Sequence, residues 1–157
     1  MKKFKNQPDI LIQVKDIGFT FSVDTSYKYN LLAPCFVDFF QEEYPASQER
    51  IESHEWLNLN FPTPENPIKT PLYLFGDVFQ RREGTKRIKC KNGTIMGCKS
   101  IIFNFEYNEK AYSELFYIDS SLCSYCTAKH KIAGILGTNF LKEHKWIIDF
   151  NKLELND

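Results

Sequence analysis

The sequence of 157 residues has little glycine, few methionines and no net charge. Seven glycines stand beside fourteen phenylalanines and eight tyrosines. Because aromatic side chains suit pleated, half-buried surfaces, this balance favours a β-rich interior. Twenty basic side chains are matched by twenty acidic ones. The overall charge therefore gives no support to nucleic-acid binding or to binding at an anionic membrane.

Long apolar runs are also missing. No stretch approaches the length of a membrane span, and no apolar segment typical of a signal peptide follows the basic start MKKFKNQPD. We therefore predict a cytoplasmic protein without a membrane partner. Neither a phosphate-binding glycine loop nor a serine-centred elbow is present. The length predicts a single domain over residues 1–157.

The cysteines are odd in number, which favours reduced thiols over a disulfide framework. They are Cys35, Cys90, Cys98, Cys123 and Cys126. Cys123 and Cys126, with His130 after them, could bind zinc if Cys90 or Cys98 completed the site. The spacing of that second pair is unlike a zinc knuckle, so we predict neither a metal nor another cofactor.

The first legible element is a β-hairpin. Residues 9–15 and 19–24 alternate between polar and apolar types around a turn at residues 16–18. Its second strand ends at Asp24. Apolar residues at helical spacing, after a proline suited to a first helical turn, then predict a short helix over residues 34–44.

Residues 44–86 are interrupted by four prolines between positions 62 and 71 and are predicted to form a variable insertion, with an exposed turn at residues 81–84. Strands over residues 56–61 and 72–79 could flank the prolines.

Order returns with two more hairpins. The first joins residues 87–90 to 94–98 around an Asn-Gly turn, and the second joins residues 99–107 to 112–118. A buried strand at 132–136, a helix at 138–144 and a strand at 146–150 follow. The basic residues at 142–145 are interpreted as the solvated end of that helix. The sum is a mostly-β domain with two short helices.

Three separated segments carry a family resemblance: Val23-Asp24-Thr25-Ser26, Lys91-Asn92-Gly93 and Ile135-Leu136-Gly137. In this order they resemble the retropepsin-like aspartic proteases, which include retroviral, retrotransposon and bacterial enzymes. The resemblance implies an acid-protease closed β-barrel with a flap hairpin. Residues 140–150 look like the ending of bacterial and retrotransposon members.

The resemblance implies three groups of site residues: catalytic Asp24, Thr25 and Ser26; substrate-binding Tyr27, Lys91, Asn92 and Gly93; and structural Ile135, Leu136 and Gly137. Two carboxylates in contact share a proton, so that one acts as acid and the other as base. Because the chain offers one Asp-Thr element of this kind, activity would need a homodimer that pairs two copies of Asp24. The substrate would be a peptide or protein.

Two departures from the family pattern leave a second interpretation open. Ser26 stands where the family has glycine, and Tyr27 stands where a small residue is usual, so both side chains could crowd the cleft. The chain could then be an inactive protease-fold module that binds extended peptides or a partner protein. Asp24 could also simply cap a turn.

Overall fold

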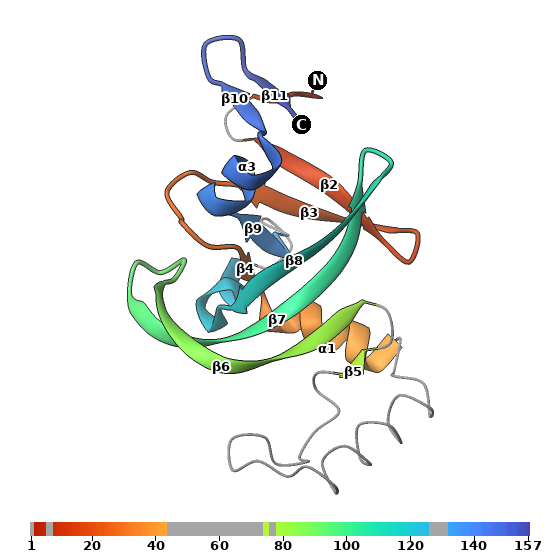
Figure 1. Ribbon diagram of the computed structural model, residues 1–157, viewed down its shortest axis with the longest axis vertical. Helices are drawn as coiled ribbons and strands as arrows, with labels where there is room; N and C mark the ends of the chain where they lie inside the picture. The colour runs from red at the N-terminus through yellow and green to blue at the C-terminus, as the bar shows by residue number, and fades with distance from the viewer. Residues whose placement is uncertain (1, 6–7, 44–73, 76–77, 126–131) are drawn as a thin grey trace, which may run out of the picture.

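The computed structural model describes residues 2–5, 8–43, 74–75, 78–125 and 132–157 (Figure 1). The strands within these ranges are β1 (Lys2–Lys3), β2 (Asp9–Val14), β3 (Ile17–Val23), β4 (Leu31–Leu32), β5 (Leu74–Phe75), β6 (Phe79–Lys89), β7 (Ile95–Tyr107), β8 (Lys110–Ile118), β9 (Gly134–Leu136), β10 (Ile147–Asp149) and β11 (Glu154–Asn156). The helices are α1 (Pro34–Glu43), α3 (Thr138–His144) and the 3-10 helix η2 (Ser120–Tyr125).

Six of the strands close into a barrel. They are hydrogen-bonded in the order β2-β3-β9-β4-β8-β7, and β2 pairs again with β7 at Gln13 and Glu106 to complete the ring. Strands β6 and β5 extend the sheet beyond β7. The prediction of a mostly-β closed barrel with two short α-helices is confirmed for the described residues.

The hairpin β2–β3 shows why this sequence forms antiparallel strands. Ile10 and Ile12 on β2 are buried, whereas Leu11 between them is 51% exposed, as strand alternation requires. Lys15 and Asp16 form the turn with φ values of 51° and 64°, the left-handed geometry of a two-residue hairpin loop. The strand therefore resumes at Ile17, inside the turn predicted at residues 16–18.

Phenylalanine rings fill the barrel and the space below α1. Phe21, Phe103 and Phe116 are fully buried, and the centroids of Phe21 and Phe103 lie 5.8 Å apart in a stacked pair. The α1 ring of Phe36 meets Phe103 edge-on at 5.4 Å. Aromatic pairs of this kind add stability beyond the area that they bury, so the high phenylalanine content predicted the nature of the core.

The end of the predicted insertion is corrected by the structure. Residues 79–86 belong to β6, which pairs with β7 along its length. The predicted turn at residues 81–84 is a β-bulge, because Arg81 pairs with Ile101 and Thr85 already pairs with Lys99. Gly84 provides the positive φ of 89° that the bulge needs. Residues 44–73, including the predicted strand at 56–61, lie outside the described residues.

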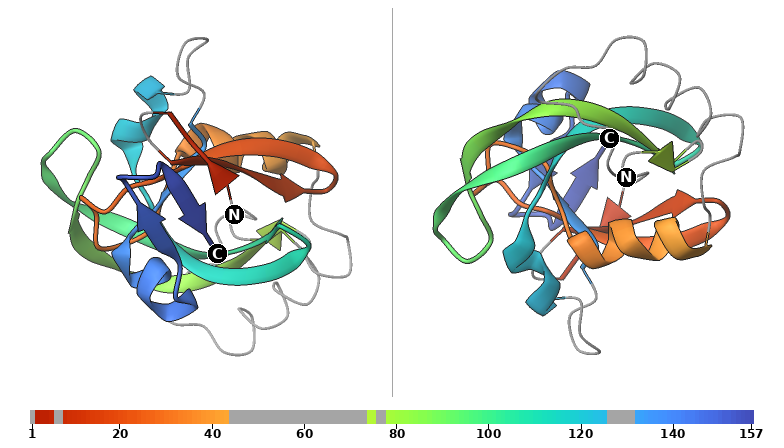
Figure 2. Two further views of the ribbon diagram at one scale, coloured as in Figure 1. Left: turned by 90° about the horizontal axis from the view of Figure 1, so that it is seen from above. Right: turned by 90° about the horizontal axis from the view of Figure 1, so that it is seen from below.

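A small second sheet joins the two ends of the chain. Its strands are ordered β1-β11-β10, with Lys2 opposite Leu155 and Ile148 also opposite Leu155. Figures 1 and 2 show this sheet projecting from one end of the barrel, next to α3. Strands β1, β4 and β11 were not predicted.

Candidate active site

Asp24 is placed by strand pairing and not by its own side chain. Strand β3 runs parallel to β9, with Val23 opposite Leu136. The Asp24 N–H then donates to the Leu136 carbonyl oxygen at 3.1 Å. Its carboxylate oxygen Oδ1 accepts the Ser26 N–H at 2.9 Å, which is the local turn expected of an aspartate at a strand end. Thr25 and Ser26 are exposed, and Asp24 is partly exposed.

Gly137 lets the loop after Asp24, residues 24–30, lie directly on β9. A Cβ atom at Gly137 would lie 2.6 Å from the Tyr29 carbonyl oxygen and 2.8 Å from that of Tyr27. The loop is then secured because the Thr138 N–H donates to the Tyr27 carbonyl oxygen at 2.9 Å. Ile135 and Leu136, which precede the glycine, are completely buried.

Asn30 closes the loop and was missed by sequence reasoning. Its buried side chain accepts the Gly137 N–H at 2.9 Å and donates to the Leu115 carbonyl oxygen at 3.1 Å. The Tyr117 N–H donates to the Asn30 carbonyl oxygen at 2.9 Å. The residue thereby links β9, β8 and the loop, which are distant in sequence. No local sequence pattern predicts such a role.

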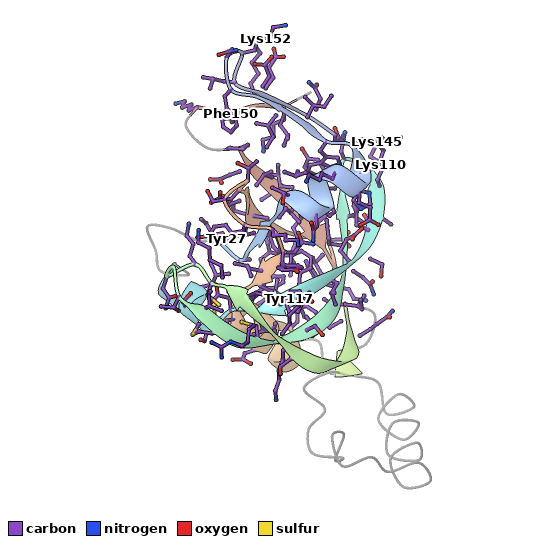
Figure 3. All side chains as sticks on the ribbon, turned by 60° about the vertical axis from the view of Figure 1, so that its left-hand side comes forward. Tyr27, Lys110, Tyr117, Lys145, Phe150 and Lys152 are labelled. Carbon is purple, nitrogen blue, oxygen red and sulfur yellow. The ribbon has the colours of Figure 1, made fainter. Side chains whose placement is uncertain are left out.

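The tip of the β6–β7 hairpin lies against the loop 24–30. The hairpin turns because the Gly93 N–H donates to the Cys90 carbonyl oxygen at 2.9 Å, with a φ of 86° at Gly93. The Tyr27 hydroxyl donates to the Lys91 carbonyl oxygen at 3.3 Å. Tyr27 is only 8% exposed, and Figure 3 shows it on the side of the molecule where the hairpin projects.

Asp119 anchors the hairpin tip from the other side and was also missed. Its side chain is fully buried. It accepts the Lys91 N–H at 2.7 Å and both the N–H and the hydroxyl of Ser121, at 2.9 and 2.6 Å. The Ser121 hydroxyl oxygen in turn accepts the Asn92 N–H at 3.2 Å. A carboxylate with three donors fixes the tip to η2.

The structure therefore brings most of the predicted site residues to one end of the barrel. Asp24 bonds to Leu136, the Tyr27 carbonyl lies against Gly137, and the Tyr27 hydroxyl bonds to Lys91. Thr25 and Ser26 lie exposed between Asp24 and Tyr27. Asn92 contacts Ser121 instead of the loop. No contact of Gly93 with the loop is described, and this residue serves the turn itself.

Two cysteines face each other at the base of the hairpin. The Sγ atoms of Cys90 and Cys98 lie 3.4 Å apart, and both side chains are buried. Burial, helped by the hydrogen bond with Cys98, raises the pKa of Cys90 to about 12. The zinc alternative also needed Cys126 and His130, which lie outside the described residues, as does the side chain of Cys123.

At the end of α3, Lys142 and Lys145 are exposed as predicted, whereas His144 is half-buried, which corrects the prediction for that residue. His144 pairs with Glu114 of β8 and packs against Phe140 with 4.4 Å between ring centroids. Burial raises the pKa of Glu114, and the hydrogen bond from His144 opposes that rise. Glu143 places a third potential ligand atom within 4.8 Å of these two.

Sequence comparisons identify no relative: no protein-family profile matches the chain, and no curated protein sequence matches it. Among solved structures, the fold is similar to the retroviral protease-like domain of Ddi1 from Leishmania major, with a TM-score of 0.48 and 10% identity. That match covers 98% of this chain and 87% of the other. The agreement with the predicted retropepsin-like barrel rests on the strand order and on the β2–β7 closure, and not on this likeness.

None of the helices in the described ranges is long and apolar enough to cross a membrane. The cytoplasmic location and the bacterial membership stay predictions.

Proposed function

We propose that the chain is an aspartic endopeptidase that works as a homodimer. The observation that supports this most strongly is the position of Asp24 at the end of β3, beside β9 and at the start of the loop that contacts the hairpin tip. The residue is partly exposed there, so an extended peptide could reach its carboxylate. Thr25 and Ser26 beside it are exposed, as residues at an interface between two copies would be in a single chain.

The chemistry needs two carboxylates. One ionised Asp24 takes a proton from water while the oxygen forms a bond to the peptide carbonyl carbon. The protonated Asp24 of the second copy donates to the carbonyl oxygen, and the resulting tetrahedral intermediate breaks at its C–N bond as the amine gains a proton. Two like charges at contact distance cannot both ionise, so the pair shares one proton.

A second copy is needed because Asp119 cannot supply the second carboxylate. Asp119 lies at the same end of the barrel, yet it is fully buried and is occupied by donors from Lys91 and Ser121. A two-fold symmetric dimer would instead bring two identical Asp24 side chains together.

Exposed apolar side chains support association. Ile95 on the hairpin is 62% exposed, and Ile147 and Phe150 near the terminal sheet are 63% and 56% exposed. In Figure 1 the hairpin and the loop 24–30 extend towards the left of the view, whereas the β10–β11 turn extends from the top. Ile95 is therefore the exposed apolar residue on the same element that contacts the loop after Asp24.

Digestion of a mixed peptide library from acidic to neutral pH tests the proposal. Wild type should cleave and Asp24→Asn should not. Asp16→Asn is the matched control, because it makes the same change at the exposed turn of the same hairpin. Cleavage that survives Asp24→Asn would place any activity at another site.

The position of Tyr27 favours a second candidate function, an inactive protease-fold module that binds extended peptides or a partner protein. The buried ring lies between the loop and the hairpin tip and reduces the room for a substrate side chain. A peptide that binds and is never cut at any pH would support this candidate. In that case Ser26→Gly combined with Tyr27→Ala is the variant expected to gain cleavage.

A further inference from the structure

Ammonium groups gather on the aromatic rings that follow Asp24. The Nζ atoms of Lys28 and Lys86 lie 5.5 and 4.6 Å from the ring centroid of Tyr29. The Tyr29 ring is itself held edge-on by Tyr117 at 5.4 Å. The hydrogen bond with Lys86 lowers the pKa of the Tyr29 hydroxyl. The lysines therefore occupy defined positions above a ring.

Tyr27 carries a second pair of ammonium groups. The Nζ atoms of Lys89 and Lys91 lie 5.4 and 5.7 Å from its ring centroid. Cation–π contacts of this length reduce the freedom of long side chains while leaving the charge able to bind an anion. The four lysines Lys28, Lys86, Lys89 and Lys91, with Tyr27 and Tyr29, are called the lysine–tyrosine patch.

The patch spans the two walls of the proposed cleft. Lys28 belongs to the loop after Asp24, whereas Lys86 and Lys89 belong to β6. These three side chains are exposed. The ion pairs recorded among the described residues are Lys3–Glu154 and His144–Glu114, and neither involves them. None of these three lysines thus forms an ion pair with a carboxylate among the described residues, whereas Lys91 interacts with Asp9.

We propose that the cleft takes extended peptides with acidic side chains on the segment that lies across the lysine–tyrosine patch. This inference rests on the proposed cleft at Asp24. A peptide lying across the exposed side of the loop and β6 would pass ammonium groups from both elements, so Asp or Glu side chains a few residues from the cut bond would meet positive charge. The patch would thus set specificity, while Asp24 would perform the chemistry.

A peptide fits this patch better than a nucleic acid does. A nucleic acid brings one phosphate per nucleotide, and tight binding needs positive charge along the whole path. The chain has no net charge, and the paired carboxylates of Asp24, which lies four residues before Lys28, would repel a phosphate. A peptide can place its acidic residues over the lysines and neutral ones over Asp24.

The test is a binding measurement that does not depend on cleavage. Immobilised full-length Asp24→Asn is incubated with a randomised octapeptide library at low salt, and the bound peptides are sequenced by mass spectrometry. Asp and Glu should be enriched about two- to five-fold at neighbouring positions, the size expected of exposed ion pairs. High salt should remove the enrichment. Bound peptides without acidic enrichment, or no bound peptides, would overturn the proposal.

A charge reversal within the patch sharpens the result. In the Asp24→Asn background, Lys86→Glu should convert the preference from acidic to basic residues at one position. Lys152→Glu is the control with the same change in charge, and Figure 3 shows Lys152 at the far end of the molecule. Lys86 is exposed, so folding is not at risk. Equal effects of the two reversals would mean that only net charge matters and would refute the patch.

The outcome separates this inference from the proposed function. If acidic residues are enriched in a way that depends on Lys86, but wild type never cuts the recovered peptides, the proposed binding of acidic peptides by the patch stands and the proposed protease activity is rejected. Cleavage without acidic preference would retain the protease and reject the patch. Displacement of the peptides by a short oligothymidylate, bound more tightly than they are, would assign the patch to a nucleic acid and overturn the peptide proposal.

Discussion

The loop after Asp24 and the tip of the β6–β7 hairpin face each other, but different kinds of contact hold them. The loop is secured by main-chain bonds to β9 and α3, including those from Asp24 to Leu136 and from Thr138 to Tyr27. The tip is secured by the carboxylate of Asp119 and the hydroxyls of Ser121 and Tyr27.

This difference separates a fixed part of the proposed site from a part that can move. Breaking the loop's bonds would disrupt the barrel, because β9 pairs with both β3 and β4. Breaking the tip's bonds costs a few polar contacts at one end of a long hairpin. Segments held by few buried contacts open at low free energy. We therefore expect the tip to admit a peptide while Asp24 stays in place.

The largest expected effect is on the fixed side. Gly137→Ala should lower the free energy of unfolding by about 3 kcal/mol, since the new methyl group would overlap two carbonyl oxygens and force the loop away. Denaturant unfolding measures this. Gly97→Ala is the control, because a Cβ at Gly97 meets nothing within 4 Å. Equal tolerance of both changes would mean that the loop is not packed on β9 as described.

A smaller effect is expected where the tip is anchored. Asp119→Ala should cost about 2 kcal/mol, because the N–H groups of Lys91 and Ser121 lose a buried acceptor. Hydrogen exchange at Lys91 and Asn92 should accelerate while exchange in β9 stays slow. Asp149→Ala is the control, since Asp149 also accepts two backbone N–H groups but in an exposed turn. Acceleration throughout the barrel would remove the distinction between the two regions.

Tyr27→Phe addresses the hydrogen bond that joins the loop to the hairpin tip. The change removes the hydroxyl that donates to Lys91 and keeps the ring. A loss of about 1 kcal/mol is expected, with faster exchange at the tip only. If exchange at the tip were unchanged, the hydroxyl would have no part in holding the hairpin down.

Near neutral pH, the smallest effect on stability concerns the base of the hairpin. Burial raises the pKa of Cys90 from 9.0 to about 12, so the stability tied to this thiol is complete below pH 9 and is lost as the pH rises towards 12. At pH 8 only about 1 in 10,000 of these thiols is ionised. Iodoacetamide should therefore label half-buried Cys35 well before Cys90, as peptide mapping would show. Asp119→Ala should reduce the difference in labelling rate between Cys35 and Cys90, because Asp119 contributes to the raised pKa of Cys90. Labelling of Cys90 as early as Cys35 in wild type would contradict the burial of Cys90.

The hairpins and the helices were predictable because their signals are local. Alternation along β2 and β3, and the Asn-Gly turn at 92–93, are contained within a few residues. The two-residue strand β4 carries no period that could be detected. The bulge at residues 81–84 looks like a turn because a glycine with positive φ serves both.

The site was predictable to the extent that it is built from contiguous motifs. Residues 24–27 and 135–137 could be found because each forms a recognisable segment. Asn30 and Asp119 were missed because their importance comes from contacts with residues 107 and 28 positions away, to Gly137 and Lys91. Lys86 was missed because residues 44–86 had been assigned to an insertion, whereas β6 in fact begins at Phe79. Lys89 was missed although it lies in the strand predicted at residues 87–90, because its position over the Tyr27 ring depends on a residue distant in sequence.

Mixing experiments test the central claim most directly, namely that two copies of Asp24 make one site. Wild type and Asp24→Asn are combined in equal amounts at fixed total concentration and allowed to exchange subunits. The rate of cleavage is then measured with a peptide that wild type cut in the library experiment. If only dimers with two aspartates are active, the rate should fall to about a quarter of that of wild type alone. A rate of about one half would mean that each chain acts independently and would contradict the shared site.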